Sequence, residues 1–332
     1  MTFLETEKAR YIAAKPGCTW LSPAAKEPGQ YRARVYDFCI PVAQAGENLF
    51  AGSRGRLLDY FDEFAIKWHD GGHRRPSNHL CSSMVCGVNF LSVMMDEPRI
   101  ATRFMRGIFG DEVAEAVPVD GSFVEFEWVG NPAIDYIGEG LDRTRGANAT
   151  SADAAMAYRR PDGGKTLVLV EWKYTESYST EYKGDGSRGE TRRARYEHLV
   201  TDPRGPIDTS RAIYDELLYE PFYQFMRQQL LAWRMTEERQ ECGADRVRVL
   251  HLSPRANTDF GRVTSPPLAE RYPDVRATGL WRSLLRDTSL FTPVAVEDAF
   301  APLLGEPSGG ELHAAWQAYA RERYPWVLRR HT

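Results

Sequence analysis

The sequence lacks any apolar run long enough to cross a membrane, and its first eight residues are acidic without the apolar core of a signal peptide. Cysteine is scarce. The five residues are odd in number and widely scattered, which argues against a disulfide framework and for reduced thiols. Internal repeats and low-complexity tracts are also missing. We therefore expect a globular, cytoplasmic protein without a membrane partner.

An excess of positive charge is missing too. The chain has 42 Lys and Arg residues against 46 Asp and Glu residues, for a formal net charge of −4. Such a protein has no global attraction for nucleic acid, so nucleic-acid binding would depend on a local basic face or on carboxylates screened by metal. With 332 residues, 42% of them hydrophobic, the chain is long enough to bury a sizeable core.

The most informative feature present is a pair of strand-like segments. Residues 151–158 and 166–173 are rich in Val, Leu, Ala and Tyr and flank a Pro/Gly turn, which predicts a β-hairpin. Because side chains alternate along a strand, Glu171 and Lys173 share one face. If paired residue numbers sum to 324 or 326, Asp153 lies opposite one of them on that face, whereas an odd sum turns it away.

The chemistry of these side chains suits a divalent metal. Two carboxylates and one main-chain carbonyl are hard oxygen ligands for Mg²⁺, and Lys173 could orient the attacking water or neutralise charge in the transition state. Taken singly, a Glu-x-Lys at a strand end is more often a solvated face, and an Asp after Ser-Ala a turn residue. However, the run 167–172 is apolar on both faces, as in a central strand. Charges at its end would be buried without purpose unless a metal or polyanion binds.

Asp153 followed by Glu171-Trp172-Lys173 resembles the signature of the PD-(D/E)XK nuclease superfamily. The strings Thr-Ser-Ala-Asp and Glu-Trp-Lys-Tyr-Thr-Glu around these residues resemble its bacterial restriction-endonuclease-like branch. The resemblance implies a Mg²⁺ (or Mn²⁺) ion held by Asp153, Glu171 and the Trp172 carbonyl, with Lys173 positioning the attacking water. It implies hydrolysis of DNA in restriction, defence or repair.

The order of elements agrees with that family's αβββαβ core, an α/β fold with a mixed central β-sheet flanked by helices. We expect this core at residues 98–255, with a basic insertion at 176–212. The flanking regions 1–97, irregular over 1–50 and then helical, and 256–332 would be elaborations of one compact unit. Periodicity predicts helices at 57–68, 82–95, 98–109, 221–233 and 313–324, and strands at 123–129, 246–252 and 291–296.

Further site residues follow from the same resemblance. Glu139 is most similar to the upstream glutamate that family members place near the metal, with Glu125 and Glu127 as rivals. On the helix after the hairpin, Gln224 and Gln228 lie one turn apart, so both could reach the metal site or the substrate backbone. A plain solvated flank is the alternative for these two glutamines.

A local basic patch lies in the insertion, formed by Arg188, Arg192, Arg193 and Arg195. Arginines with interleaved tyrosines suit phosphate contacts and base stacking, although a solvated helix face would have the same composition.

A cluster of histidines and cysteines precedes the core. Cys81 and Cys86 are separated by four residues rather than two, and their segment has the pattern of a buried helix, so we expect no structural zinc. The segment from His79 to Ser83 could bind a phosphate at the helix start, or Ser82 could simply cap the helix.

Two other functions are compatible with these observations: a nuclease-fold module that binds nucleic acid or a partner protein without cutting, and an RNA-directed nuclease. The intact Asp, Glu and Lys argue against a silent module. A homodimer would allow both DNA strands to be cut, and a partner protein could activate the enzyme, but the sequence has no heptad that would specify a dimer.

Overall fold

A computed structural model describes residues 1–145, 149–305 and 309–328. Its centre is a mixed six-stranded sheet with the order β3-β5-β6-β7-β8, in which β4 also pairs with β5. Strands β3 to β6 pair antiparallel, and β7 and β8 add in parallel. The strands are β3 (Glu115–Val117), β4 (Glu125–Trp128), β5 (Ala152–Arg159), β6 (Lys165–Trp172), β7 (Arg246–Ser253) and β8 (Phe291–Ala295).

The predicted hairpin is confirmed as β5 and β6. Pairs such as Ala154 with Val170 have numbers that sum to 324, which is the even register that turns Asp153 toward Glu171. The turn closes because the Gly164 N–H donates to the Asp162 carboxylate at 2.9 Å. The register is therefore set locally, at the opposite end of the hairpin from the acidic residues.

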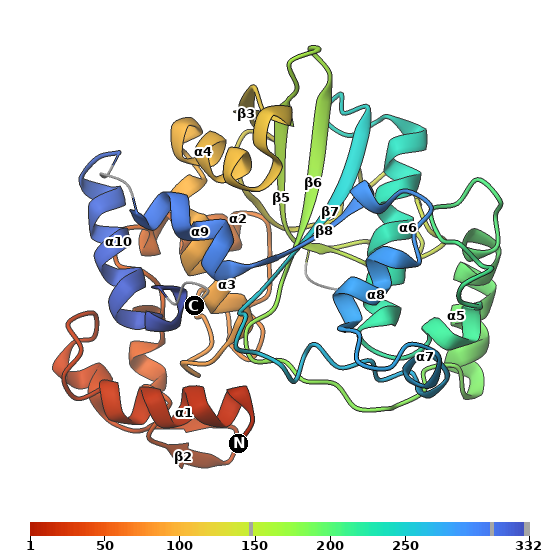
Figure 1. Cartoon of the computed structure of the whole chain (residues 1–332). Helices are drawn as coiled ribbons and strands as arrows, with labels where there is room; N and C mark the ends of the chain where they lie inside the picture. The colour runs from red at the N-terminus through yellow and green to blue at the C-terminus, as the bar shows by residue number, and fades with distance from the viewer. Residues whose placement is uncertain (146–148, 306–308, 329–332) are drawn as a thin grey trace.

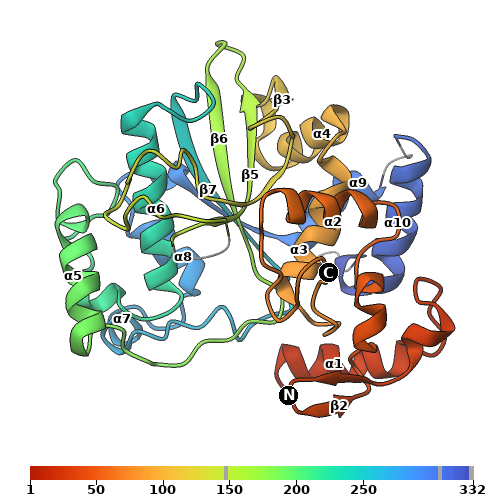
Figure 2. The same ribbon diagram turned by 180° about the vertical axis from the view of Figure 1, so that it is seen from behind.

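Helices cover both faces of the sheet (Figures 1 and 2). One face carries α6 (Phe222–Glu238) and α8 (Ala277–Ser283), and the other carries α3 (Ser83–Leu91), α4 (Pro98–Phe109) and α9 (Val296–Gly305). The side chains of β6 divide accordingly. Leu167 and Leu169 join the core under α6, whereas Val168, Val170 and Trp172 join the core with α3. This strand is thus buried on both faces, as its apolar run predicts.

The outer elements extend these two layers. On the α3 side lie α1 (Phe3–Ala14), α2 (Arg54–Glu63), α10 (Glu311–Arg323) and the hairpin of β1 (Gly29–Tyr31) and β2 (Arg34–Tyr36); on the α6 side lie α5 (Gly186–Val200) and α7 (Pro266–Arg271) (Figure 1). Short 3₁₀ helices occur at Pro23–Lys26, Val42–Asn48, Ser92–Met94, Gly110–Glu112, Tyr214–Leu217, Thr288–Leu290 and Pro325–Leu328. In the part of the chain that the structure describes, no helix is long and apolar enough to cross a bilayer.

Two predictions for the N-terminal part are wrong. Residues 1–50 are not all irregular, because α1 begins at a capping box in which Thr2 and Glu5 bind each other's backbone N–H. The helix predicted at 57–68 ends at Glu63 as α2. After the turn, the Trp68 ring stacks on Phe61 with centroids 3.8 Å apart, so the helical spacing of these aromatics has a tertiary origin.

The region after residue 255 is part of the same sheet. The strand predicted at 291–296 is β8, and it pairs in parallel with β7 from Phe291 to Ala295. The larger of the two apolar cores contains residues from Phe3 to Val327. The N-terminal and C-terminal elaborations therefore share a core with the strands that carry the hairpin.

Candidate active site

Three carboxylates occupy one register position on three neighbouring strands. The pairs Phe126–Ala154 and Trp128–Ala152 of β4 and β5 place Glu127 opposite Asp153 between them. One step beyond the pair Ala154–Val170 of β5 and β6, the same register places Asp153 opposite Glu171. Directly opposite residues share a face of a sheet, so the acids line up across its end. Lys173 follows two residues later, and its ammonium forms an ion pair with the Glu171 carboxylate.

Asp153 is held by the backbone of the neighbouring strand. Its Oδ2 accepts the N–H of Trp172 at 2.7 Å. Burial and the nearby Glu171 carboxylate raise the pKa of Asp153 well above its ordinary value. Two carboxylates that repel each other in this way form a position where a cation is stabilised.

Glu171 is held from α6. The Gln224 amide donates to one of its oxygens at 2.6 Å, and the Gln228 amide, one turn later, donates to the other. The structure thus brings both glutamines to the carboxylate. Glu171 is 1% exposed, so these hydrogen bonds satisfy a charge that has lost its water.

Lys173 is charged at neutral pH. Burial alone would lower its pKa, but Glu171, Tyr178 and Asp153 together hold the pKa above its ordinary value. Its backbone N–H donates to the carbonyl of Leu252 on β7 at 2.8 Å, which fixes the end of the strand. Lys173 therefore presents an ammonium group beside the two carboxylates.

Glu127 is the third acid of the row. It has a φ of 47°, a left-handed conformation that costs a non-glycine residue roughly 1 kcal/mol or more. Burial and the Glu171 carboxylate raise its pKa to about 7. Strain and an unfavourable carboxylate at one residue are typical of a functional position.

Glu127→Gln is expected to stabilise the metal-free protein at pH 8 but hardly at pH 5. The folded pKa of Glu127 lies above its unfolded value, so its contribution to stability is lost as the pH rises toward 7. The variant's amide does not ionise, so the variant keeps this stability, which amounts to about 2 kcal/mol of unfolding free energy at pH 8. Urea melts in EDTA at both pH values measure the difference. An equal gain at the two pH values would contradict the explanation.

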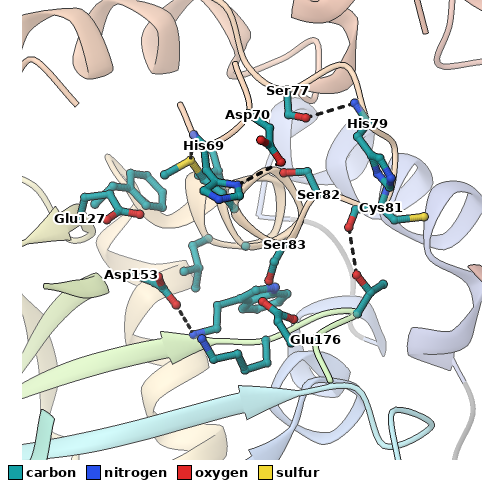
Figure 3. Close-up of a pocket in the computed structure, with 18 of the residues that line it drawn as sticks. His69, Asp70, Ser77, His79, Cys81, Ser82, Ser83, Glu127, Asp153 and Glu176 are labelled. Atoms are coloured by element: carbon teal, nitrogen blue, oxygen red, sulfur yellow. Dashed lines mark hydrogen bonds and ion pairs between the residues drawn. The ribbon is translucent and has the colours of Figure 1, made fainter. Parts of the chain in front are cut away.

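Two of the three acids, Glu127 and Asp153, line a cavity of about 450 Å³ (Figure 3). One wall comes from the ends of the strands and the other from the segment that leads into α3. The residues that line the cavity include Tyr31, His69, Asp70, His79, Ser83, Met84, Phe126, Glu127, Asp153, Trp172, Lys173 and Glu176. The site is therefore enclosed on one side by the N-terminal part of the chain.

Glu139, the upstream acid predicted from the resemblance, has other partners. Its carboxylate accepts the N–H and hydroxyl of Thr150 and the hydroxyl of Tyr196, each at 2.6 Å. These bonds anchor the chain just before β5. Glu125 is bound by Tyr60 and Arg145. Of the three glutamates considered, Glu127 has the register position of Asp153. The sequence contains no signal that separates it from Glu125 on the same strand.

The basic patch lies on α5, on the outer side of α6 (Figure 1). Arg193 pairs with Glu197 and Asp215, whereas Arg192 donates to the Lys183 carbonyl at 2.6 Å. Arg188 is exposed and Arg195 half-buried. Part of the positive charge is therefore neutralised within the protein.

The histidine and cysteine cluster is dispersed. Cys81 and Cys86 are buried in the apolar core, and His73 pairs with Asp62 at 2.9 Å near the surface. Ser82 caps α3 by accepting the Val85 N–H at 3.4 Å. Across residues 1–145, 149–305 and 309–328, no three His, Cys, Asp or Glu side chains are preassembled around a metal position.

Elemental analysis of the purified protein is expected to find no stoichiometric zinc. Because Cys81 and Cys86 serve as core residues, chelation should leave the melting temperature unchanged while removing any metal-dependent activity. One tightly bound zinc per chain, with unfolding on chelation, would contradict this prediction.

A mixed sheet flanked by helices, with acids at the end of its central hairpin, is a restriction-endonuclease-like α/β fold. The family model described as restriction endonuclease associating with ARP matches residues 19–324, and the chain belongs to that family. Membership indicates a nuclease. The match includes the segments on both sides of residues 98–255. Comparison with curated proteins and with solved structures gives no match.

Proposed function

We propose that the protein hydrolyses DNA phosphodiester bonds in a Mg²⁺- or Mn²⁺-dependent reaction of the PD-(D/E)XK type, in restriction, defence or repair. The observation that carries this proposal is the hairpin register, which sets Asp153 opposite Glu171 with Lys173 paired to the latter. The even-numbered register therefore brings two carboxylates and one ammonium group together.

Asp153, Glu171 and the Trp172 carbonyl are the proposed metal ligands. The Trp172 N–H donates to Asp153, and the carbonyl of an extended residue points to the same side as its N–H. These are hard oxygen donors of the kind that Mg²⁺ prefers. Burial and the repulsion from Glu171 raise the pKa of Asp153, and a cation would relieve that repulsion. When bound, the metal would polarise the phosphate and neutralise charge on its oxygens.

The protein's own groups have separate tasks in this proposal. The Lys173 ammonium donates to the attacking water and stabilises charge that develops in the transition state. Gln224 and Gln228 hold the Glu171 carboxylate in one orientation. Glu127, whose pKa is about 7, can hold a proton near the reacting groups.

The direct test is incubation with Mg²⁺ or Mn²⁺ and single- and double-stranded DNA and RNA, beside Lys173→Ala. We expect DNA to be cut by the parent and about a hundredfold or more slowly by the variant. Preferential cutting of RNA would redirect the proposal to an RNA-directed nuclease. The family description names an association with ARP, so the cleavage assays are repeated with added partner extract. A measurement of the oligomeric state tests for a homodimer. If no condition supports cleavage, a silent module that binds nucleic acid or a partner protein is the better account.

Replacing Arg192, Arg193 and Arg195 by Ala is expected to weaken DNA binding and flatten its salt dependence. Each lost phosphate contact lowers the log–log slope by roughly one unit. Arg193 already pairs with two acids, so its share should be the smallest. Binding isotherms at several salt concentrations measure the slope, with Arg204→Ala, an exposed arginine paired to Asp202, as the control. An unchanged slope would show that the patch is a solvated helix face that makes no phosphate contacts.

A further inference from the structure

The lining side chains of the cavity differ in their exposure to solvent. At its mouth, the side chains of His69 and Asp70 are 78% and 31% exposed. Farther in, the side chain of Lys173, which also lines the cavity, is 8% exposed. In Figure 3, Asp153 lies by the end of the strands, and His69 and Asp70 lie on the segment across from it. A substrate must therefore pass the N-terminal wall to reach the acids.

The size of the cavity limits what can enter. About 450 Å³ is within the range of small-molecule pockets, which is enough for a nucleotide but not for a stacked base pair with both its strands. Enzymes that act inside such pockets take single strands, or nucleotides that have left the duplex stack. The enclosure of Asp153 and Lys173 thus restricts the form of the DNA.

The walls have the chemistry of a base-binding site. Phe126, Trp172 and Met84 supply apolar and aromatic surface, on which bases of any sequence can stack. His79 accepts the Cys81 N–H on Nδ1 at 3.1 Å, so the proton of the neutral ring is on Nε2, which has no protein partner among the described residues. Burial lowers the pKa of His79 to about 4, which keeps this ring neutral.

Two further polar atoms lack partners. Ser83 Oγ and Trp172 Nε1 belong to cavity-lining residues and are buried without a hydrogen bond to any described residue. Leaving a buried polar atom unpaired costs about 1–3 kcal/mol. The cost is recovered when a ligand supplies the missing donor or acceptor, and the edge of a base has both kinds of group.

We propose that the cavity receives one unpaired nucleotide of DNA, so that cleavage occurs where a strand is single or a nucleotide has left the duplex. This inference rests on the proposed function. The phosphate would meet Asp153 and Lys173, while the base would contact the wall formed by Trp172, His79 and Ser83. The N-terminal segment thereby determines the substrate form.

Binding is the first test, and it does not depend on cleavage. Fluorescence anisotropy in Ca²⁺ compares a labelled eight-nucleotide single strand with a hairpin-closed duplex of the same sequence, using the Lys173→Ala protein. We expect the single strand to bind at least tenfold more tightly. Ser83→Leu fills the cavity without removing a hydrogen bond within the protein, and we expect it to abolish the preference for the single strand. Ser289→Leu, at an exposed serine outside the cavity, is the matched control.

Cleavage is the second test. With the parent protein and Mg²⁺, a single strand and a duplex with a mismatched bubble should be cut at least tenfold faster than the hairpin-closed duplex. Equal binding and cutting of the fully paired duplex would overturn the inference and leave the proposed nuclease intact. Single-strand binding that Ser83→Leu weakens, without cleavage under any condition, would support the cavity assignment and overturn the proposed hydrolysis.

Discussion

Asp153→Asn and Glu171→Gln are each expected to abolish DNA cleavage, and Lys173→Ala to lower the cleavage rate by about a hundredfold or more. The first two substitutions remove negative charge that we propose holds the metal. The third removes an ammonium that, in the folded protein, is paired with Glu171 and stays charged. Loss of one group that acts mainly in the transition state typically has an effect of this size.

The measurements separate the two roles. Calorimetry with Mn²⁺ should show metal binding lost in the two carboxylate variants and largely kept in Lys173→Ala, whose affinity for DNA should also be kept. Glu181→Gln, at an exposed acid away from the cavity, controls for charge removal and should cut normally. Three variants as active as the parent would exclude this site from the chemistry.

Phe90→Ala is expected to lower the free energy of unfolding by about 3–5 kcal/mol. The ring is 1% exposed and lies at the junction of the N-terminal helices, the central sheet and the C-terminal helices. Its aromatic neighbours, with centroids 4.8 to 6.2 Å away, are Trp172, Phe300, Trp316, Tyr324 and Trp326. Removing it leaves a cavity bordered by all three regions.

Urea melts followed by circular dichroism and by tryptophan fluorescence measure the loss. If residues 1–97, 98–255 and 256–332 form one unit, the two signals should shift together, since all three regions border the cavity. Phe64→Ala, at a half-buried ring that contacts Tyr60 and Arg145, should cost clearly less. A shift in only one signal would show that the elaborations unfold separately.

Local patterns predicted the elements whose causes are local. The hairpin follows from alternating apolar residues around a Gly-containing turn, and α4 from Pro98 in its first turn with one apolar face. Hydrophobic periodicity did not predict helix α1, because this helix buries about one residue per turn and one of these is the charged Glu7. Its capping residues Thr2 and Glu5 were the available signal.

By itself, the sequence determined the α/β fold class and predicted that Asp153, Glu171 and Lys173 lie together, because strand alternation and a short turn leave few registers for a hairpin. Only the tertiary structure decided which upstream glutamate joins them. Glu125, Glu127 and Glu139 have similar local contexts, and Glu127 is distinguished by its position opposite Asp153 on a neighbouring strand. The enclosed cavity also results from tertiary packing. Its walls come from segments as far apart in the chain as Tyr31 and Trp172, and short-range periodicity contains no information about such long-range packing.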